Sequence, residues 1–302
     1  MKLIIFFAAT VAFSDALACD MCGCAMGGNY TGIYPQFTQN LIGITYQNRD
    51  FKHPFTSLNF NGESRVLSDN FDSYELWGRF YLSPRIQVLA FLPYRVHSRK
   101  ESLRTTRISG IGDMAAMVNY TVFNTADTTR IKLKHSLLAG VGVKLPTGKY
   151  QQRDDSGSSL PAQFQVGNGA YALTGNLNYT LRYRNWGAQF DFNYRYNTIN
   201  EWQYRFGNQV ALNANVFYMW VQNSLVILPS MGISFEHYQK DEEYGVVKPE
   251  TGGEIALLNA GADVYFKQFF ARANIQKPIE QNLPFAQPNA GVRMNFSVGV
   301  SF

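Results

Sequence analysis

Apolar and polar residues alternate along this chain with a period of two. The clearest examples are residues 171–184 and 188–197, where Tyr, Leu and Phe on one side oppose Asn, Thr, Arg and Asp on the other. Successive side chains of a β-strand point to opposite faces, whereas an amphipathic helix repeats every 3.6 residues. Because each segment keeps period two for about a dozen residues, the pattern predicts strands and excludes helices there.

The same alternation predicts twelve strands. Their ranges are 41–47, 74–82, 86–97, 112–123, 131–144, 171–184, 188–197, 209–221, 225–237, 255–266, 269–276 and 291–302. Pro93 lies inside the third of them and has no backbone N–H, so it predicts a bulge or an unpaired position.

The links between these strands alternate in length. Short links follow the even-numbered strands, near Pro84, Thr125, Asn185, Asn223 and Gln268. Longer polar links follow the odd-numbered strands, over residues 51–71, 98–109, 150–167, 200–207, 239–252 and 277–288. Outer-membrane barrels combine short periplasmic turns with long external loops, whereas a soluble β-sandwich has no reason to alternate them. The sequence therefore predicts an all-β fold, a transmembrane antiparallel β-barrel of about 12 strands over residues 41–302, with both termini in the periplasm.

One face of each predicted strand suits lipid, and the other would line the lumen. Lipid offers no partner to backbone polar groups, so the sheet must close on itself. The predicted lumen-lining charges are Glu75, Arg79, Asp113, Lys132, Lys134, Lys144, Arg182, Asp191, Arg195, Asp263, Arg272 and Arg293. We expect these charges to pair across the lumen and make it rigid. A barrel of this size does not have to contain an open pore.

The predicted last strand, residues 291–302, ends the chain on an aromatic residue. Met294, Phe296, Val298, Val300 and Phe302 share its apolar face. A terminal strand of this kind resembles the sorting signal that bacterial outer-membrane barrels present to their assembly machinery. This resemblance implies that the barrel assembly machinery is a partner.

The other end of the chain predicts export. Lys2 precedes an apolar run over residues 3–13, and residues 16–18 (ALA) fit a small-residue cleavage site, so residues 1–18 indicate a secretory signal peptide. The run of 11 residues is too short to cross a bilayer as a helix, which needs roughly 20. A lipoprotein is the alternative because Cys19 follows the site directly, but Ala16 stands where lipoprotein signals usually carry Leu.

Composition agrees with a barrel and not with a nucleic-acid binder. Aromatic residues make up 15% of the chain and charged residues only 16%, while the mean hydropathy is −0.20. Alternating strands average to such values without any long apolar segment. The formal charge of +5 is spread along the chain and forms no basic stripe, so we expect no nucleic-acid partner.

Three cysteines, the only ones in the protein, lie just after the predicted cleavage site. Cys19, Cys22 and Cys24 have C-x-x-C-x-C spacing, and two methionines lie nearby. Thiolates at this spacing can converge on a soft ion such as Cu(I) or Zn(II), which makes these residues candidate metal ligands. A disulfide between two of them, in an oxidising periplasm, is the simpler alternative. No cofactor other than copper or zinc is indicated.

Several internal phrases carry a resemblance to a known family. They are SGIGD at residues 109–113, VKLPTG at 143–148 and QKPI at 276–279. In order and spacing, residues 105–302 resemble outer-membrane transporters grouped with meta-pathway phenol-degradation proteins and, more distantly, long-chain fatty-acid channels of the FadL type. The resemblance implies passage of small hydrophobic or aromatic molecules past an amino-terminal hatch. The fatty-acid channels have fourteen strands, against the twelve predicted here.

The segment 19–40 has two interpretations. Its Gly- and Cys-rich sequence, followed by Tyr30, Pro35 and Gln36, resembles a group of Bacteroidetes barrels of unassigned role. It is long enough to enter the lumen as a plug, or it can remain a periplasmic segment.

A catalytic barrel finds little support. Outer-membrane phospholipases also have twelve strands and use His and Ser, but this chain has no H-x-S-N-G stretch among its four histidines. His135 and Ser136 are neighbours on a predicted strand, so their side chains point to opposite faces and cannot form a nucleophile–base pair. We therefore expect no enzymatic activity.

The sequence thus predicts a channel or transporter for small molecules in the outer membrane of a Gram-negative bacterium. The alternative is a copper- or zinc-handling protein that uses the barrel as a scaffold for the cysteine cluster. Expected partners are outer-membrane lipid and lipopolysaccharide, whose phosphates would meet a basic link that contains His97, Arg99, Lys100, Arg104 and Arg107. A solvated loop is the simpler interpretation of that link.

The sorting-signal interpretation predicts a defect when Phe302 is replaced by Ala. We expect less folded barrel in the outer membrane, measured as the fraction that shows heat-modifiable migration on a gel. Wild-type amounts of folded protein in the variant would contradict this interpretation.

Overall fold

The computed structural model describes residues 39–52, 57–58, 64–65, 68–101, 104–125, 132–153, 157, 159–284 and 289–302 of the 302-residue chain. The predicted signal peptide, the cysteine cluster and nearly all of the predicted plug therefore lie outside the described residues.

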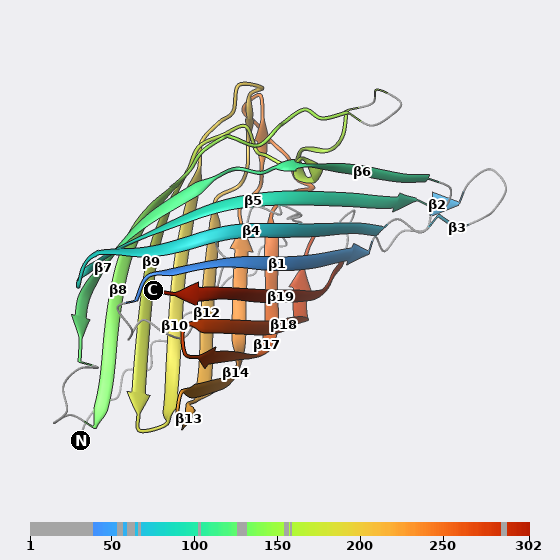
Figure 1. Cartoon of the computed structure of the whole chain (residues 1–302). Helices are drawn as coiled ribbons and strands as arrows, with labels where there is room; N and C mark the ends of the chain where they lie inside the picture. Colours follow the sequence, from blue (N-terminus) through green and yellow to red (C-terminus); the bar gives the residue numbers. More distant parts are fainter. Residues whose placement is uncertain are drawn as a thin grey trace, which may run out of the picture.

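The described strands form one closed antiparallel barrel (Figure 1). Its strands are β1 (Leu41–Lys52), β4 (Ser68–Ser83), β5 (Ile86–Glu101), β6 (Arg104–Ile111), β7 (Ala115–Asn124), β8 (Leu133–Lys144), β9 (Ala172–Tyr183), β10 (Trp186–Asn197), β12 (Gln209–Tyr218), β13 (Trp220–Gln222), β14 (Leu225–Tyr238), β17 (Gly253–Phe266), β18 (Phe269–Asn282) and β19 (Asn289–Ser301). β6 and β7 are two parts of one strand beside β5, and β12 and β13 are two parts of one strand beside β14. Counted in this way, twelve strands surround the lumen, which confirms the predicted fold class.

Two pairings close the barrel. β1 pairs with β19 from Leu41↔Ser301 to Lys52↔Asn289, with one irregularity between Arg49 and Phe51. β12 pairs with β14 and joins the two remaining edges of the sheet. Each other neighbouring pair is antiparallel and consecutive along the chain. The first and last strands of the barrel are thus hydrogen-bonded neighbours.

The two ends of the barrel differ, and we call them the turn end and the loop end. Residues 84–85, 184–185, 223–224 and 267–268 connect strands at the turn end. The connections at the loop end include residues 145–171, with the 3-10 helix η1 (Ala162–Phe164), and residues 198–208 and 239–252. Short pieces β11 (Tyr204–Arg205), β15 (Glu242–Glu243) and β16 (Val246–Val247) form a small sheet there, and β2 (Ser57–Leu58) pairs with β3 (Ser64–Arg65).

One predicted loop is wrong. Residues 98–109 belong mostly to β5 and β6. These two strands pair as far as Glu101↔Arg104, at the tip of their hairpin. Apart from Leu103 and the buried Ile108, the hairpin is polar where it extends the wall, so the apolar alternation that marks a lipid-facing strand is missing. Alternation reports contact with lipid, and a strand that rises beyond the apolar band does not carry it.

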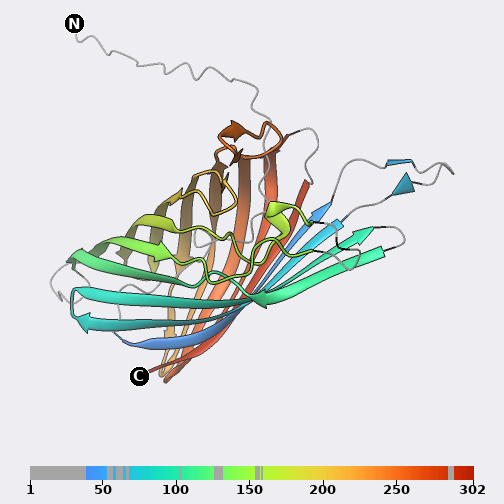
Figure 2. The same cartoon turned by 90° about the horizontal axis from the view of Figure 1, so that it is seen from above.

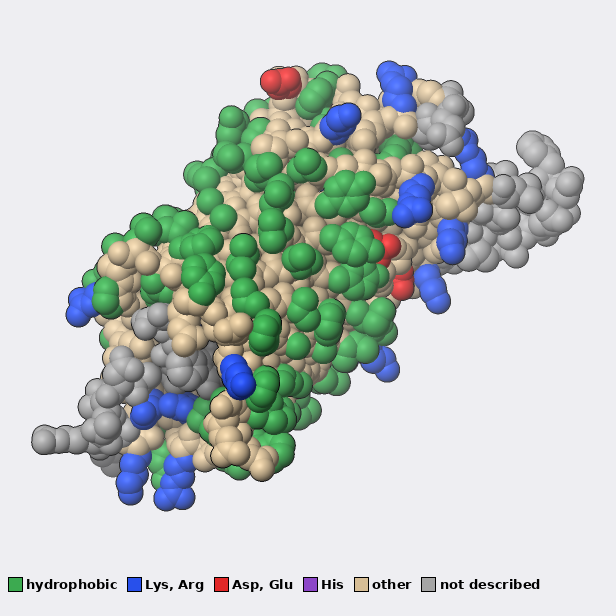
Figure 3. All heavy atoms as spheres, viewed as in Figure 1, with side chains coloured by type: hydrophobic (Ala, Val, Ile, Leu, Met, Phe, Trp, Pro, Cys, Tyr) green, Lys and Arg blue, Asp and Glu red, His purple; other side chains and the backbone are tan. Residues whose placement is uncertain are grey.

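An apolar band surrounds the barrel between its ends. Leu82, Val141 and Met231 are 72%, 71% and 58% exposed, and all lie on outward positions of their strands. Figure 3 shows hydrophobic side chains across the middle of the visible face, with Lys and Arg mainly toward its two ends. Such a band matches the hydrocarbon layer of a membrane. Among the described residues, no helix is long and apolar enough to cross a membrane.

The wall is interrupted beside Pro93. β5 pairs with β7 up to Phe91↔Ala115 and with β6 from Tyr94↔Ile111, so residues 112–114 leave the ladder. Pro93 lies at this step, where its missing N–H costs no ladder bond, and its carbonyl accepts from Gly112 N at 2.8 Å. The sequence thus marked the place where β6 and β7 separate.

Candidate functional site

The lumen contains a central layer of paired charges. Arg293 Nη1 on β19 lies 2.8 Å from Glu236 Oε1 and 2.9 Å from Oε2 on β14. β17 and β18 separate these strands in the sheet, so the ion pair bridges the lumen and not two neighbouring strands. Tyr238 also donates to Glu236, at 2.6 Å. Both charged side chains are almost fully buried, so the pair lies away from bulk water.

A second ion pair lies nearer the turn end. Arg272 Nε donates to Asp263 Oδ1 at 2.9 Å between β18 and β17. Leu41, Trp77, Leu89, Phe91, Ala115, Met117 and Phe270 form an apolar cluster there. Another apolar cluster at the loop end contains Phe51, Phe71, Ile108, Phe164, Val166, Ile255, Leu257 and Ala290. The lumen therefore has apolar layers toward both ends and a charged layer between them.

The predicted lumen charges differ in their surroundings. The buried ones are Glu75, Arg79, Asp113, Lys144, Arg195, Asp263, Arg272 and Arg293. Lys134, Arg182 and Asp191 are half-buried on β8, β9 and β10. Asp191 accepts from Asn178 and Gln189. Lys132 is exposed in a bend that precedes β8, so the predicted inward place on a strand from residue 131 is wrong.

The segment 145–171 folds into the barrel and narrows its loop end (Figure 2). Phe164 and Val166 of this segment have no exposed surface and pack in the loop-end apolar cluster. Phe164 meets Phe71 edge-on at 5.8 Å between ring centroids. Outer-membrane barrels have long loops at one end, and such loops can fold into the lumen. This segment does so, and it therefore constricts the barrel at the loop end.

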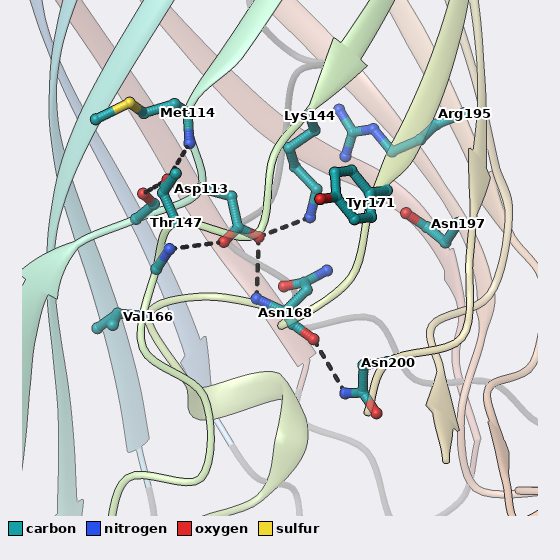
Figure 4. A network of polar contacts seen from close by, with 12 residues as sticks. Asp113, Met114, Lys144, Thr147, Val166, Asn168, Tyr171, Arg195, Asn197 and Asn200 are labelled. Carbon is teal, nitrogen blue, oxygen red and sulfur yellow. Dashed lines mark hydrogen bonds and ion pairs between the residues drawn. The ribbon is translucent and has the colours of Figure 1, made fainter. Parts of the chain in front are cut away.

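Asp113 fastens this inward segment to the interrupted wall (Figure 4). Its Oδ2 accepts from Lys144 Nζ at 2.9 Å and from Asn168 N at 2.9 Å. Its Oδ1 accepts from Gly148 N at 3.0 Å. Asp113 thereby joins the break between β6 and β7, the end of β8 and two points of the inward segment. A buried carboxylate with a cation and two backbone donors is well satisfied.

Two side chains of β5 hold the inward segment from the other side. Arg95 Nη1 donates to Val166 O at 2.8 Å. His97 Nδ1 lies 2.8 Å from Phe164 O, and because a carbonyl only accepts, this nitrogen carries the proton. Both side chains are buried, so the interpretation of His97 as part of a basic rim is wrong.

Arg99 also turns away from that rim. It makes a bidentate pair with Asp69, at 2.7 and 2.9 Å, and its guanidinium lies 5.0 Å from the ring centroid of Phe164. Lys100, Arg104 and Arg107 remain exposed on the β5–β6 hairpin. The basic surface at the loop end is therefore smaller than the sequence predicted.

A buried carboxylate also organises the outermost loops. Asp241 Oδ2 accepts from Tyr204 Oη at 2.5 Å and from Gln163 Nε2 at 2.9 Å, and Oδ1 accepts from Gly207 N at 2.7 Å. Burial raises the pKa of Asp241 to about 6, while the three donors oppose that increase. The loops after β8, β10 and β14 meet at this one residue.

Several of these residues were missed in the sequence. Arg95, Glu236 and Asp241 were not among the predicted lumen residues. Arg95 lies between Tyr94 and Val96, and Glu236 follows the outward Phe235 and is two residues from the inward Ser234, so strict alternation would have found both. Asp241 lies in a loop, where no periodicity exists to mark it.

The candidate metal ligands Cys19, Cys22 and Cys24 lie outside the described residues. Within the described part of the chain, no group of three or more His, Cys, Asp or Glu side chains is placed to hold a metal ion.

Comparisons with known proteins agree on the fold. No protein-family model matches the sequence, and no curated protein matches it significantly. The structure is similar to the COG4313 outer membrane channel from Pseudomonas putida F1, with a TM-score of 0.65, 14% identity, and coverage of 91% of this chain and 98% of that chain. It is also similar to the β domain of the Bordetella autotransporter BrkA, with a TM-score of 0.53, 11% identity, and coverage of 88% and 100%. The fold is thus that of bacterial outer-membrane barrels, and the finer grouping with phenol-degradation or FadL-type proteins is not confirmed.

Replacement of Arg293 by Met should weaken the barrel. Glu236 would lose the guanidinium nitrogen that contacts both of its oxygens in a buried place, which costs about 3 kcal/mol or more. We expect the heat-modifiable gel shift to occur at a lower temperature. The double variant Arg293→Met with Glu236→Gln removes both charges and should recover part of the loss. A single variant as heat-resistant as the wild type would contradict the structural role of this pair.

Replacement of Asp113 by Asn should loosen the inward segment while leaving the barrel closed. The variant leaves Lys144 without its buried counter-charge and weakens acceptance from Gly148 and Asn168. Hydrogen exchange should become faster in peptides that cover these two amides. Peptides from β17 and β18, distant from Asp113, serve as the internal control and should not change. Unchanged protection at residues 148 and 168 would show that Asp113 does not hold the segment.

Proposed function

We propose that this protein is an outer-membrane channel for small hydrophobic or aromatic molecules, described here in a closed state. The observation that carries the proposal is the inward segment 145–171 at the loop end of a closed barrel. A lipid-compatible outer face and a polar interior suit a conduit through a membrane. The turn end then faces the periplasm and the loop end faces the exterior of a Gram-negative cell.

The closed state depends on a few specific contacts. The inward segment is held by Asp113, Arg95 and His97 through the bonds described above. The rest of the contact is apolar packing of Phe164 and Val166. If the segment moved out of the lumen, its polar groups would form hydrogen bonds with water in place of these contacts. Loop movements of this kind gate enzyme sites and pores.

The apolar layers favour hydrophobic cargo. Phe51, Phe71 and Phe164 meet with ring centroids 5.6 and 5.8 Å apart in edge-on geometry. Aromatic rings present both apolar area and a polarised edge, so a displaced Phe164 would leave a place that suits another apolar or aromatic group. This expectation agrees with the substrate class that the family resemblance implies.

The partners of the proposed channel follow from its surface. The apolar band would contact membrane lipid, and Phe302 at the end of β19 would present the signal for the barrel assembly machinery. Exposed Lys100, Arg104 and Arg107 on the hairpin would meet lipopolysaccharide phosphates.

Two proposals concern the amino-terminal part of the chain. Residues 19–40 are proposed as a plug, and residues 1–18 as a signal peptide. The metal-handling alternative rests on Cys19, Cys22 and Cys24, and no observation in the described part of the chain favours it. We propose no catalytic activity.

Replacement of Gly167 by Ala should open the channel. A Cβ at this position would lie 2.4 Å from the backbone C and O of Gly148, so the two backbones must separate. That separation also pulls Gly148 and Asn168 away from Asp113. We expect a higher single-channel conductance in planar bilayers and faster entry of an uncharged aromatic dye into liposomes.

The matched control is Gly110→Ala. Its Cβ would lie 3.7 Å from Val166, an ordinary contact, so conductance should remain at the wild-type level. A Gly167→Ala barrel that folds fully and passes neither ions nor dye would refute the channel proposal.

A further inference from the structure

A pocket opens among the outermost loops and shares residues of η1 with the inward segment. It has a volume of about 440 Å³ and is formed by residues of segments 145–171, 198–208 and 239–252. This volume falls in the range of small-molecule sites. The pocket belongs to the loop end, so on the proposed orientation it faces the exterior.

Hydrogen bonds within the protein fix the back wall of the pocket. Tyr204 and Gln163 line the pocket, and both donate to the buried Asp241 behind them. Gln163 Nε2 also donates to Tyr204 Oη at 2.9 Å. Because Asp241 draws together three loops, these side chains hold fixed positions in the wall.

Hydrogen-bond accounting shows which groups a ligand would meet. The two Nε2 hydrogens of Gln163 are used by Tyr204 and Asp241, which leaves its carbonyl oxygen as the accessible part of the amide. The hydroxyl hydrogen of Tyr204 is used by Asp241. The carboxylates of Glu243 and Glu250 are acceptors as well. The lining therefore offers acceptors to a ligand that carries donors, beside the ammonium group of Lys248 and the hydroxyl of Tyr244 in the same wall.

The charges of the lining have a negative surplus. Two carboxylates, Glu243 and Glu250, line the pocket with one cation, Lys248, which pairs with Glu243 and also interacts with the charge of Glu250. Asp241 adds a further acidic group behind the wall. An anionic ligand would be repelled here, whereas a cation would be attracted.

The aromatic part of the lining also favours a cation. The rings of Tyr150 and Trp202 lie 4.9 Å apart between centroids, and both line the pocket. A Cβ on Gly169 would lie 2.7 Å from Trp202 Cζ3, so the absence of a side chain there lets the indole pack closely against the backbone. The electron-rich face of such a ring attracts cations.

We propose that this pocket binds a small organic ammonium ion. The ammonium group lies near Glu250 and the Gln163 carbonyl, and the hydrocarbon part packs against Trp202. The function of such a site is to capture a cationic ligand at the mouth of the barrel. The inference concerns binding alone and stands whether or not the barrel conducts.

The test uses the full chain in detergent and three probes of similar shape. Isothermal titration compares 2-phenylethylammonium chloride with neutral 2-phenylethanol and anionic 3-phenylpropanoate. We expect saturable binding of the ammonium, weaker binding of the alcohol and none of the carboxylate. Binding of the ammonium should also weaken as salt is added.

Two variants locate the charge that attracts the ligand. Glu250→Gln should weaken binding of the ammonium about threefold to fivefold, the effect of one partly exposed charge. Glu280→Gln removes an equal charge from an exposed position on β18, outside the lining, and should leave the affinity unchanged.

Tryptophan emission locates the ligand. Trp202 is the one tryptophan of the four that lies in the outermost loops, so binding should change its emission. Trp202→Phe should remove that change while the other indoles still emit. The inference is overturned if the alcohol binds as tightly as the ammonium, if Glu250→Gln has no effect, or if the emission change persists in Trp202→Phe.

Discussion

Closure of the sheet is the constraint on which the rest of this structure depends. Each backbone N–H and C=O within the hydrocarbon layer needs a partner in the protein, because lipid provides none. The pairing of β1 with β19 and of β12 with β14 removes the edges that an open sheet of this length would expose. Once the sheet is closed, alternation sends one face to lipid and the other into the lumen. The apolar band and the polar interior are both consequences of that single requirement.

The enclosed interior then requires that each buried charge has a partner. A charge that alternation places in the lumen is removed from bulk water and is stable only with a partner. Arg293 and Glu236 satisfy this condition across the lumen, and Arg272 and Asp263 satisfy it between adjacent strands. Loss of either member of such a pair would leave the other as an uncompensated buried charge.

Asp113 connects the wall to that segment. It lies where the strand beside β5 is interrupted, and it binds Lys144, Gly148 and Asn168. The interruption gives its carboxylate room to reach two backbone amides that a continuous ladder would keep away. Pro93 stabilises the same step, since it needs no ladder partner. The inward segment is thus held at the point where the regular strand is interrupted. Asp241 has a similar role among the outer loops.

The sequence by itself determined the class of fold and the number of strands, and it predicted the face to which the lumen charges belong. These features follow from a period of two, which neighbouring residues encode locally and lipid enforces. It also marked Pro93 and placed Asp113 in the interior. It did not reveal that residues 98–109 continue the wall, because that hairpin rises beyond the lipid and lacks alternation. Only the tertiary structure decided that Arg293 meets Glu236 and that Asp113 holds residues 148 and 168. Such partners are distant in the chain, and they meet only after closure, strand tilt and register have set the positions of all twelve strands.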